Sequence, residues 1–260
     1  MELGLQGKSV LVTGASKGIG LGCAELFAAE GASLHLAARG KDLLETRREA
    51  IRSAHQVDVQ VHPIDLAVSG SAEELVERCG DVDVLVNNAG AIPGGTVDQV
   101  DEPRWREAWD LKVFGYINIT RQYFRRMRDR GGGTIINVIG MAGESYDAAY
   151  IAGTAGNASL MAFTRGIGST SIDQGVRIVG VNPGAVETDR IRALLAGKAE
   201  TELGDRERWR EFLSNLPLGR AASVAEVANV VVFLASERAS YLSGIIVTVD
   251  GGRAARGGTF

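Results

Sequence analysis

The chain alternates short apolar runs with segments of helical periodicity along nearly all of its 260 residues. Short apolar runs bounded by turn residues are typical of strands buried on both faces, and the segments between them are typical of helices. The alternation therefore predicts an α/β fold with one doubly wound, parallel, seven-stranded sheet. The predicted strands are Ser9–Val12, Leu34–Ala37, Val57–Val61, Val82–Val86, Thr134–Val138, Val176–Val181 and Ile245–Val249. The predicted helices are Ile19–Ala29, Asp42–Ala54, Ala72–Arg78, Glu102–Arg128, Ala148–Asp173 and Ala225–Ala235.

One segment breaks this alternation. Residues 187–217 form a long stretch rich in charge, and it predicts a helical lid beside the active site. Apolar side chains make up 45% of the chain, enough to bury one large core, so we expect residues 1–260 to form a single domain. The lid's apolar side chains predict an apolar wall for the substrate without fixing its identity: Leu194, Leu195, Trp209, Phe212, Leu213 and Leu216.

Charge and hydropathy exclude two classes of partner. The net charge is −4, and cationic residues occur in no run longer than a pair such as Arg47-Arg48, so the sequence predicts no nucleic-acid binding. Apolar runs are strand-sized rather than membrane-sized, which predicts no membrane association. The first strand begins near Lys8, which leaves no room for a cleavable leader, so we expect a soluble, cytoplasmic protein.

Cysteines and histidines are predicted to be structural. Cys23 and Cys79 lack the spacing of a metal site or a disulfide framework. His35 and His62 lie in or beside strands and His55 ends a helix, so no pair has metal-ligand spacing. We therefore expect no metal.

A glycine-rich turn follows the first strand. Gly14, Gly18 and Gly20 lie between that strand and an apolar helix, where backbone N–H groups and the helix dipole favour a phosphate. A tight turn without a ligand is the alternative. The pattern Thr-Gly-x-x-x-Gly-x-Gly differs from the common G-x-G-x-x-G fingerprint, which makes it informative.

These motifs resemble those of the short-chain dehydrogenase/reductase family, a Rossmann-fold family of oxidoreductases. The resemblance runs nearly end to end and is carried by the glycine turn together with Asn87-Asn88-Ala89-Gly90, Asn182-Pro183-Gly184 and Asp250-Gly251-Gly252. It implies that Asn87 ties strands together. The cofactor-binding positions that it implies are Gly14, Ser16, Lys17, Ile19, Asp65, Leu66, Asn88, Ala89, Gly90, Tyr150, Pro183, Gly184, Val186 and Thr188.

Cofactor choice is argued from charge at the end of the second strand. An NAD enzyme needs an acidic residue there for the ribose 2′-hydroxyl, whereas this chain offers Ala37-Ala38-Arg39. Lys17 and Arg39 would form charge-assisted hydrogen bonds with a 2′-phosphate. We therefore predict NADP(H), with two solvated surface charges as the alternative.

The resemblance implies a proton relay of tyrosine, lysine, serine and asparagine, and this chain departs from it. Tyr150 fits the tyrosine that exchanges a proton with the substrate oxygen, with simple ring packing as the alternative. Thr154 stands at the lysine position and Gly140 at the serine position. Ser145 or Tyr146 could donate a hydrogen bond to substrate, although turn serines mostly serve local geometry.

Lys112 stands at the asparagine position. An ammonium about 4 Å from a phenol at an effective dielectric of about 20 contributes about 4 kcal/mol, which lowers the phenol's pKa by roughly three units. We hypothesise that Lys112 reaches into the space vacated at Thr154 and acts as a catalytic residue beside Tyr150. A lysine that snorkels, or that pairs with Asp110, is an equal alternative.

Three functions are compatible with these residues. The first is an NADP(H)-dependent oxidoreductase that interconverts a small-molecule carbonyl and a secondary alcohol, with Tyr150 as acid/base. The second is a catalytically silent NADP(H)-binding sensor or scaffold, and the third is a lyase or isomerase on the same fold. Residues 217–220, the helix at 224–235 and the last strand resemble the elements with which family members assemble, so we expect a homo-oligomer, a tetramer or dimer.

Overall fold

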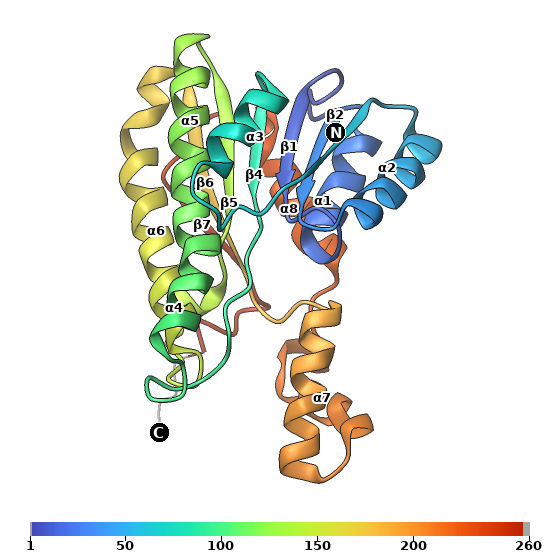
Figure 1. Cartoon of the computed structure of the whole chain (residues 1–260), viewed down its shortest axis with the longest axis vertical. Helices are drawn as coiled ribbons and strands as arrows, with labels where there is room; N and C mark the ends of the chain where they lie inside the picture. Colours follow the sequence, from blue (N-terminus) through green and yellow to red (C-terminus); the bar gives the residue numbers. More distant parts are fainter. Residues whose placement is uncertain (1, 257–260) are drawn as a thin grey trace.

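The computed structural model describes residues 2–256, which form one seven-stranded parallel sheet with the order β3-β2-β1-β4-β5-β6-β7 (Figure 1). All seven predicted strands are present, so the predicted fold class is confirmed. Only their ends differ from the predicted ranges by a few residues. The strands are β1 Ser9–Thr13, β2 Ser33–Ala38, β3 Val59–Pro63, β4 Val84–Asn87, β5 Gly133–Val138, β6 Val176–Pro183 and β7 Ile246–Val249.

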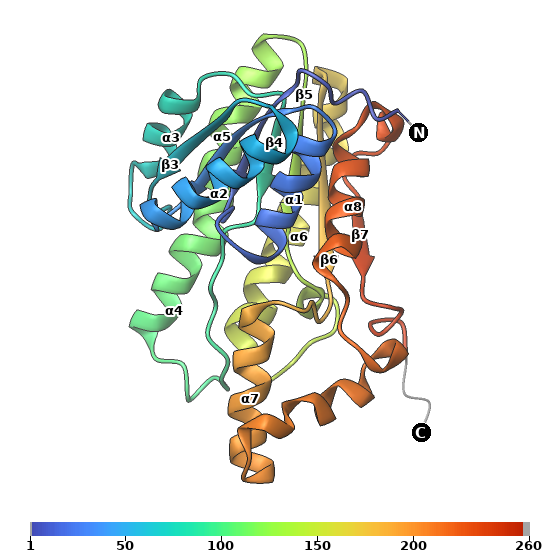
Figure 2. The ribbon, with the colours of Figure 1, turned by 90° about the vertical axis from the view of Figure 1, so that its right-hand side faces the viewer.

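Helices cover both faces of the sheet (Figure 2). Apolar side chains of α1, α2 and α8 pack on one face, where Phe27, Leu44 and Val231 belong to one buried cluster. The opposite face carries α3 and α5, with Leu75 and Tyr123 in a second buried cluster. The helices are α1 Gly18–Ala29, α2 Lys41–His55, α3 Ser71–Cys79, α4 Glu102–Trp109, α5 Gly115–Asp129, α6 Ile151–Ser171, α7 Asp189–Leu203 and α8 Val224–Ala235.

The predicted helix Glu102–Arg128 is divided by a wider turn. A π-helical segment, Asp110–Phe114, separates α4 from α5 and contains Lys112. π-Helical turns inside α-helices occur frequently at functional sites. Hydrophobic periodicity predicted the helix but not this local change of winding.

Helix α6 begins at Ile151, three residues after the predicted start. Tyr150 precedes the helix with a non-helical backbone, φ −135° and ψ 39°. An isolated bridge pairs Tyr150 with Gly95, and the Gly95 N–H donates to the Ala149 carbonyl oxygen at 2.7 Å. This pairing holds the chain extended before the helix and fixes the entry of Tyr150.

The predicted lid segment is helical. Helix α7 is followed by the 3₁₀-helices Arg206–Asn215 and Pro217–Gly219. Figure 1 and Figure 2 show α7 extending away from the sheet as an arm beyond the strand ends. Its role as a lid stays a prediction.

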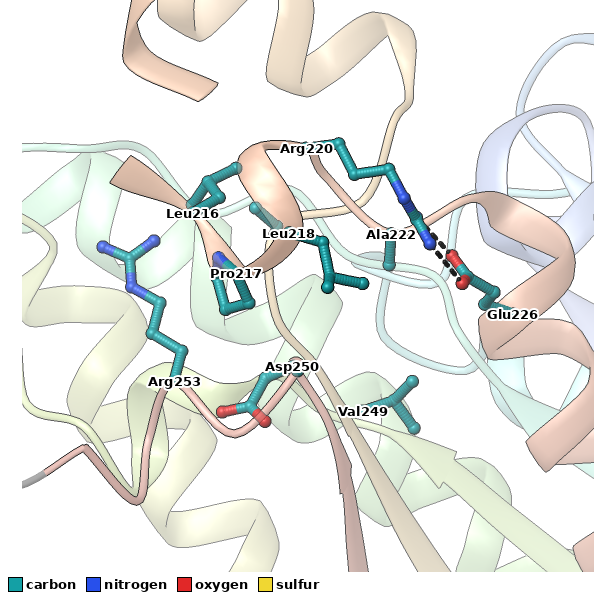
Figure 3. A pocket seen from close by; sticks show the side chains of 11 residues that line it. Leu216, Pro217, Leu218, Arg220, Ala222, Glu226, Val249, Asp250 and Arg253 are labelled. Carbon is teal, nitrogen blue, oxygen red and sulfur yellow. Dashed lines mark hydrogen bonds and ion pairs between the residues drawn. The ribbon is translucent and has the colours of Figure 1, made fainter. Parts of the chain in front are cut away.

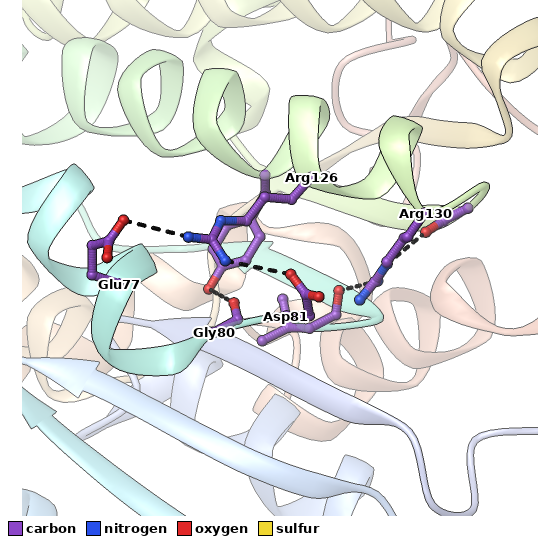
Figure 4. Close-up of polar contacts among 8 residues, drawn as sticks. Glu77, Gly80, Asp81, Arg126 and Arg130 are labelled. Atoms are coloured by element: carbon purple, nitrogen blue, oxygen red, sulfur yellow. Dashed lines mark hydrogen bonds and ion pairs between the residues drawn. The ribbon is translucent and has the colours of Figure 1, made fainter.

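An ion-pair network joins α3 to α5 at the surface (Figure 4). Arg126 lies 3.4 Å from a carboxylate oxygen of both Glu77 and Asp81, and the Arg130 side chain bonds the Gly132 carbonyl oxygen at 3.1 Å. These groups fasten the turn before β4, far from the strand ends that carry the candidate site.

Across residues 2–256, none of the helices combines the length and the hydropathy required to span a bilayer.

Candidate active site

The glycine turn between β1 and α1 forms a cradle suited to a phosphate. Gly14 and Gly18 have φ of +66° and +58°, a left-handed conformation that favours glycine. A Cβ at Gly20 would lie 2.4 Å from the Gly14 carbonyl oxygen, so side chains are excluded here. No side chain caps the first turn of α1, which leaves its N–H groups free for an anion. The cradle therefore fits the predicted dinucleotide.

The end of β4 is tied to this cradle. Asn88 donates from its side-chain nitrogen to the Thr13 and Gly14 carbonyl oxygens at 3.1 and 3.3 Å. The N–H groups of Asn88 and Ala89 donate to the Thr13 hydroxyl at 2.9 and 3.1 Å. The structure thus brings the predicted residues Gly14, Asn88 and Ala89 together, with Gly90 immediately after them.

Asn87 has the strand-tying role that the sequence predicted. Its side-chain nitrogen donates to Asn137 Oδ1 of β5 at 2.9 Å and to the Thr120 hydroxyl of α5 at 3.0 Å. Both contacts are buried.

Exposed cations flank the cradle at the end of β2. Lys17 precedes α1, Arg39 follows β2, and both are exposed. Arg47 of α2, to which the sequence assigned no chemistry, donates from Nε to the Ser16 carbonyl oxygen at 3.2 Å. Helical spacing does not predict this contact, because the contact joins α2 to a loop 31 positions earlier in the chain.

The chain after β6 closes the cradle from the other side. Thr188 is the N-cap of α7, and its Oγ1 accepts from the Ile191 N–H at 3.4 Å. Its methyl group lies 3.3 Å from where a Cβ of Gly18 would stand. Val186 is buried and pairs with Ala222 in an isolated bridge, while the Gly184 N–H donates to the Val249 carbonyl oxygen at 2.9 Å. Thr188 therefore borders the glycine turn, while Gly184 and Val186 are fixed to β7 and to the segment before α8.

Asp65 and Leu66 follow β3 at the same edge of the sheet, half-buried, and Asp65 Oδ1 accepts from the Ala67 N–H at 3.0 Å. Ile19 is half-buried in the first turn of α1 and packs against the core. Every predicted cofactor position thus lies at or beside the carboxyl ends of the strands, where doubly wound sheets bind ligands.

Tyr150 is half-buried, and its ring lies against Gly153, one turn into α6. A Cβ at Gly153 would stand 2.0 Å from the ring. Burial raises the pKa of the Tyr150 phenol, and the positive charge of the Arg190 guanidinium opposes that rise. The Arg190 guanidinium is therefore a cation close to Tyr150.

Arg190 comes from the first turn of α7. Its guanidinium donates to the Ile92 carbonyl oxygen at 2.7 Å and to the Gly90 carbonyl oxygen at 3.4 Å. These bonds link α7 to the loop after β4, directly beside the cofactor cradle. Sequence reasoning missed Arg190 because it lies among other charged residues of a predicted exposed helix.

Lys112 is buried, with only 8% of its surface exposed. Its ammonium donates to the Tyr116 hydroxyl at 3.0 Å and to the carbonyl oxygens of Val138 and Ile139 at 2.8 and 3.1 Å. An ammonium has three N–H donors, and these bonds use all three. Burial, with the Arg190 charge, lowers the pKa of Lys112 to about 7.

This placement differs from the expected reach of Lys112 toward Thr154. The Thr154 hydroxyl instead donates to the Asp147 carbonyl oxygen at 3.2 Å and accepts from the Asp147 N–H at 3.3 Å. The alternative of a lysine paired with Asp110 also differs from these contacts, which fasten Lys112 to the end of β5. The catalytic role of Lys112 stays a prediction.

The other two candidate donors point outward. Ser145 is exposed, and Tyr146 has 79% of its surface exposed. Neither donates a side-chain hydrogen bond to another residue within the described range 2–256. The Met141–Gly143 turn that precedes them packs on α6 instead, because a Cβ at Gly143 would stand 2.8 Å from the Ala158 nitrogen.

The predicted structural histidines form a buried pair. His35 Nδ1 and His62 Nε2 lie 3.0 Å apart, with ring centroids 5.2 Å apart, and Cys79 lies close by. The distance between the ring centroids exceeds the distance between the two nitrogens by about twice the distance from a ring nitrogen to its own centroid. The two centroids and the two nitrogens therefore lie nearly on one line, and each nitrogen points at the other. That alignment suits a hydrogen bond from one ring to the other, and His35, His62 and Cys79 offer ligand atoms within 4.8 Å of one another.

A hollow lies at the base of the arm, between the Pro217–Gly219 turn, the start of α8 and the end of β7 (Figure 3). Arg220 and Glu226 form a two-pronged ion pair on its rim, at 2.8 Å for each contact. None of the residues predicted for the cofactor or for catalysis lines this hollow. The hollow is therefore separate from the candidate site predicted around Tyr150.

The fold and this site define a class: a single parallel α/β sheet with a glycine cradle for a dinucleotide and a tyrosine beside it. A family described as Enoyl-(Acyl carrier protein) reductase matches residues 14–254. The chain belongs to the short-chain dehydrogenase/reductase family. The family predicted from the sequence is thereby confirmed.

Relatives span almost the whole chain. It is 33% identical to a glucose and ribitol dehydrogenase of Daucus carota, over 97% of this chain and 87% of the relative. It is 30% identical to a 3-oxoacyl-(acyl-carrier-protein) reductase of Aquifex aeolicus, over 97% of this chain and 99% of the relative. The structure of L-sorbose reductase from Gluconobacter frateurii with NADPH and L-sorbose superposes with a TM-score of 0.92 at 32% identity, covering 98% of this chain and 99% of that one. The predicted NADP(H) agrees with the cofactor in that complex.

Proposed function

We propose that this chain is an NADP(H)-dependent oxidoreductase that interconverts a carbonyl compound and a secondary alcohol, with Tyr150 as acid/base. The observation that carries the proposal is that Tyr150 packs against the cluster containing Ile92, whose carbonyl oxygen accepts from the Arg190 guanidinium at 2.7 Å next to the glycine cradle. A phenol and a cation at that position suit proton exchange with a substrate oxygen.

One group of residues binds NADP(H), and Tyr150 transfers the proton. NADP(H), when bound, supplies or accepts the hydride. Gly14, Gly18 and the first turn of α1 hold its phosphates, and Lys17 and Arg39 select the 2′-phosphate. Tyr150 gives a proton to the carbonyl oxygen during reduction and takes one from the hydroxyl during oxidation.

Arg190 stabilises the phenolate form of Tyr150 in place of the family lysine. A cation favours the charged form of a nearby acid, so it makes Tyr150 a better proton donor than burial alone would allow. Lys112 holds the end of β5 through two carbonyl oxygens and thereby positions the residues from Gly140 onward. Both roles follow from the departures at Thr154 and Gly140, which we propose are real differences from the family's usual relay.

The substrate is proposed by class only. Two relatives act, by their names, on sugars or sugar alcohols and one on an acyl-carrier-protein thioester. The half-buried lid residues Trp209 and Phe212 favour a substrate with an apolar part. A panel must therefore contain a ketose, a 3-oxoacyl thioester and a hydrophobic ketone.

A homo-oligomer in the cytoplasm is proposed as the working form. Apolar side chains lie exposed on or beside the elements expected to assemble: Leu218 at 84%, Phe233 at 39% and Tyr241 at 95%. A subunit contact on these elements would cover these apolar side chains.

One experiment separates the three candidate functions. Binding of NADPH and its consumption with the carbonyl panel are measured on the same preparation. Stereospecific consumption supports the reductase; tight NADPH binding without turnover supports a silent sensor. Product formation without any cofactor supports a lyase or isomerase. Either of the last two results overturns the proposal.

A further inference from the structure

The backbone at Gly140 excludes any side chain. Its φ is +139° and its ψ 140°, a region open essentially to glycine alone. Its N–H donates to Asn182 Oδ1 at 3.3 Å, which fixes the end of β5 in this conformation. The serine expected at this position is thus replaced by a glycine that the backbone requires.

The side chain of Asn157 fills the space beside Gly140. A Cβ at Gly140 would stand 2.9 Å from Asn157 Nδ2, so a side chain at 140 and this amide exclude one another. The two positions lie in different elements, the end of β5 and the middle of α6. The serine hydroxyl expected at position 140 is lost, and the Asn157 amide occupies the space beside that position.

The Asn157 amide is buried and uncommitted. Only 4% of Asn157 is exposed, and its Oδ1 has no hydrogen-bond partner. No hydrogen bond joins its amide nitrogen to another residue in the described range 2–256. Buried polar groups are almost always hydrogen-bonded, so Oδ1 lacks the donor that such a group needs, and the two N–H groups on Nδ2 are available to an acceptor that is not part of the chain.

Asn157 shares a helix face with Tyr150. The Tyr150 ring lies against Gly153, and Asn157 follows Gly153 by four positions on α6. Residues four apart are neighbours on one helix face. The Tyr150 ring and the Asn157 amide therefore lie along one side of α6, and Asn157 faces the end of β5 at Gly140.

We propose that the Asn157 amide donates a hydrogen bond to the substrate oxygen, the role that the family resemblance gives to a serine at position 140. This inference rests on the proposed function. During reduction the oxygen gains negative charge before Tyr150 protonates it, and a fixed N–H donor stabilises that charge. Removing a single donor of this kind lowers turnover by about 10²- to 10³-fold.

The test compares Asn157→Ala with Asn157→Ser, using the best substrate of the carbonyl panel. The two variants are matched in size, and only serine keeps a donor. We expect Asn157→Ala to lose about 10²- to 10³-fold in kcat/KM and Asn157→Ser to retain at least about tenfold more activity than Asn157→Ala. The Kd for NADPH should stay within about twofold in both.

Ser159→Ala is the control on the same helix, because its hydroxyl bonds only the Gly156 carbonyl oxygen at 2.7 Å. If Asn157→Ala fails to fold, Asn157→Asp tests the same N–H donor, because it removes the donor and keeps the shape of the side chain. Equal activity in the Ala and Ser variants, or wild-type activity in Asn157→Asp, overturns the inference and leaves the proposed function standing. A wild-type enzyme that binds NADPH but reduces no carbonyl overturns both.

Discussion

Tyr150 and Arg190 come from separate elements of the fold. Tyr150 was predicted from its motif, and its place at the start of α6 follows from pairing with Gly95. The cation beside it, Arg190, comes from a distant helix, so neither spacing nor periodicity pointed to it. Lys112, by contrast, was singled out from its sequence position, but its direction depends on a π-helical turn that no pattern predicted.

Removing Arg190 tests its effect on the phenol. Without the cation the pKa of Tyr150 rises, so less phenolate exists near neutral pH and alcohol oxidation slows. We expect Arg190→Met to shift the pKa in the pH profile of kcat/KM upward and to slow alcohol oxidation at pH 7. Arg192→Met is the matched control, because Arg192 pairs with Glu187 at 3.0 Å. Superimposable profiles for the two variants would exclude the role of Arg190.

Lys112 makes stability depend on pH. Its pKa falls from 10.5 in the unfolded chain to about 7 in the folded one. Between these values the unfolded state binds the additional proton, so stability rises with pH. Relative to Lys112→Met, the wild type should gain up to roughly 1.4 kcal/mol per pH unit from pH 7 upward. Urea unfolding of both proteins at several pH values measures this, and parallel dependences would contradict it.

At the scale of elements, the sheet determines where function lies. The carboxyl ends of β1, β4 and β6 meet at the glycine cradle through bonds such as Asn88 to Gly14. Sequence patterns predicted all seven strands and this meeting point because buried parallel strands read as continuous apolar runs. They could not predict contacts between elements, such as Arg47 to Ser16 or His35 to His62, since nothing local requires them.

Lys17 and Arg39 lie exposed beside the end of β2, and we propose that they select the 2′-phosphate. A hydrogen bond to a charged group contributes about 1.5–3 kcal/mol, so Lys17→Ala with Arg39→Ala should weaken NADPH binding by roughly 100-fold or more. The Kd for NADH should change little. Arg48→Ala is the control, because Arg48 pairs with Glu45 at 2.9 Å. Fluorescence titration measures both cofactors, and an equal loss for NADH would argue against a 2′-phosphate site.

The histidine pair between β2 and β3 predicts sensitivity to acid. Burial, followed by the charges of His35 and Arg78, lowers the pKa of His62 from 6.5 to about 4. As pH falls from 6.5 toward 4, His62 becomes protonated in the unfolded state but stays neutral in the folded state. The free energy of unfolding therefore falls by roughly 3 kcal/mol. His62→Gln should flatten this decline, whereas His55→Gln at the end of α2 should not. Equal slopes in all three proteins would show that the pair does not govern the acid response.

Across the whole molecule, one core supports a projecting arm that contributes a charged group to the site. Arg190 belongs to the arm formed by α7, and its partners Gly90 and Ile92 belong to the sheet's loops. A movement of the arm would therefore also move the Arg190 cation relative to Tyr150. Periodicity predicted the arm's helices from residue 187 onward, but its packing depends on contacts that the sequence alone does not specify.

Assembly is tested on the exposed apolar surface near the chain's carboxyl end. Replacing Phe233 on α8 with Asp places a charge where we expect a subunit contact, and burying an unpaired charge is costly. Light scattering after size exclusion should show an oligomer for the wild type and a smaller species for Phe233→Asp. A monomeric wild type would contradict the proposed oligomer.

Transfer of deuterium from deuterated NADPH to a ketone, followed in wild type and in Tyr150→Phe, tests the central claim most directly. The account predicts transfer from one face of the nicotinamide in the wild type. In Tyr150→Phe it predicts a loss of about 10²- to 10⁴-fold with unchanged NADPH binding. Undiminished transfer in Tyr150→Phe, or none in a wild type that binds NADPH tightly, would contradict it.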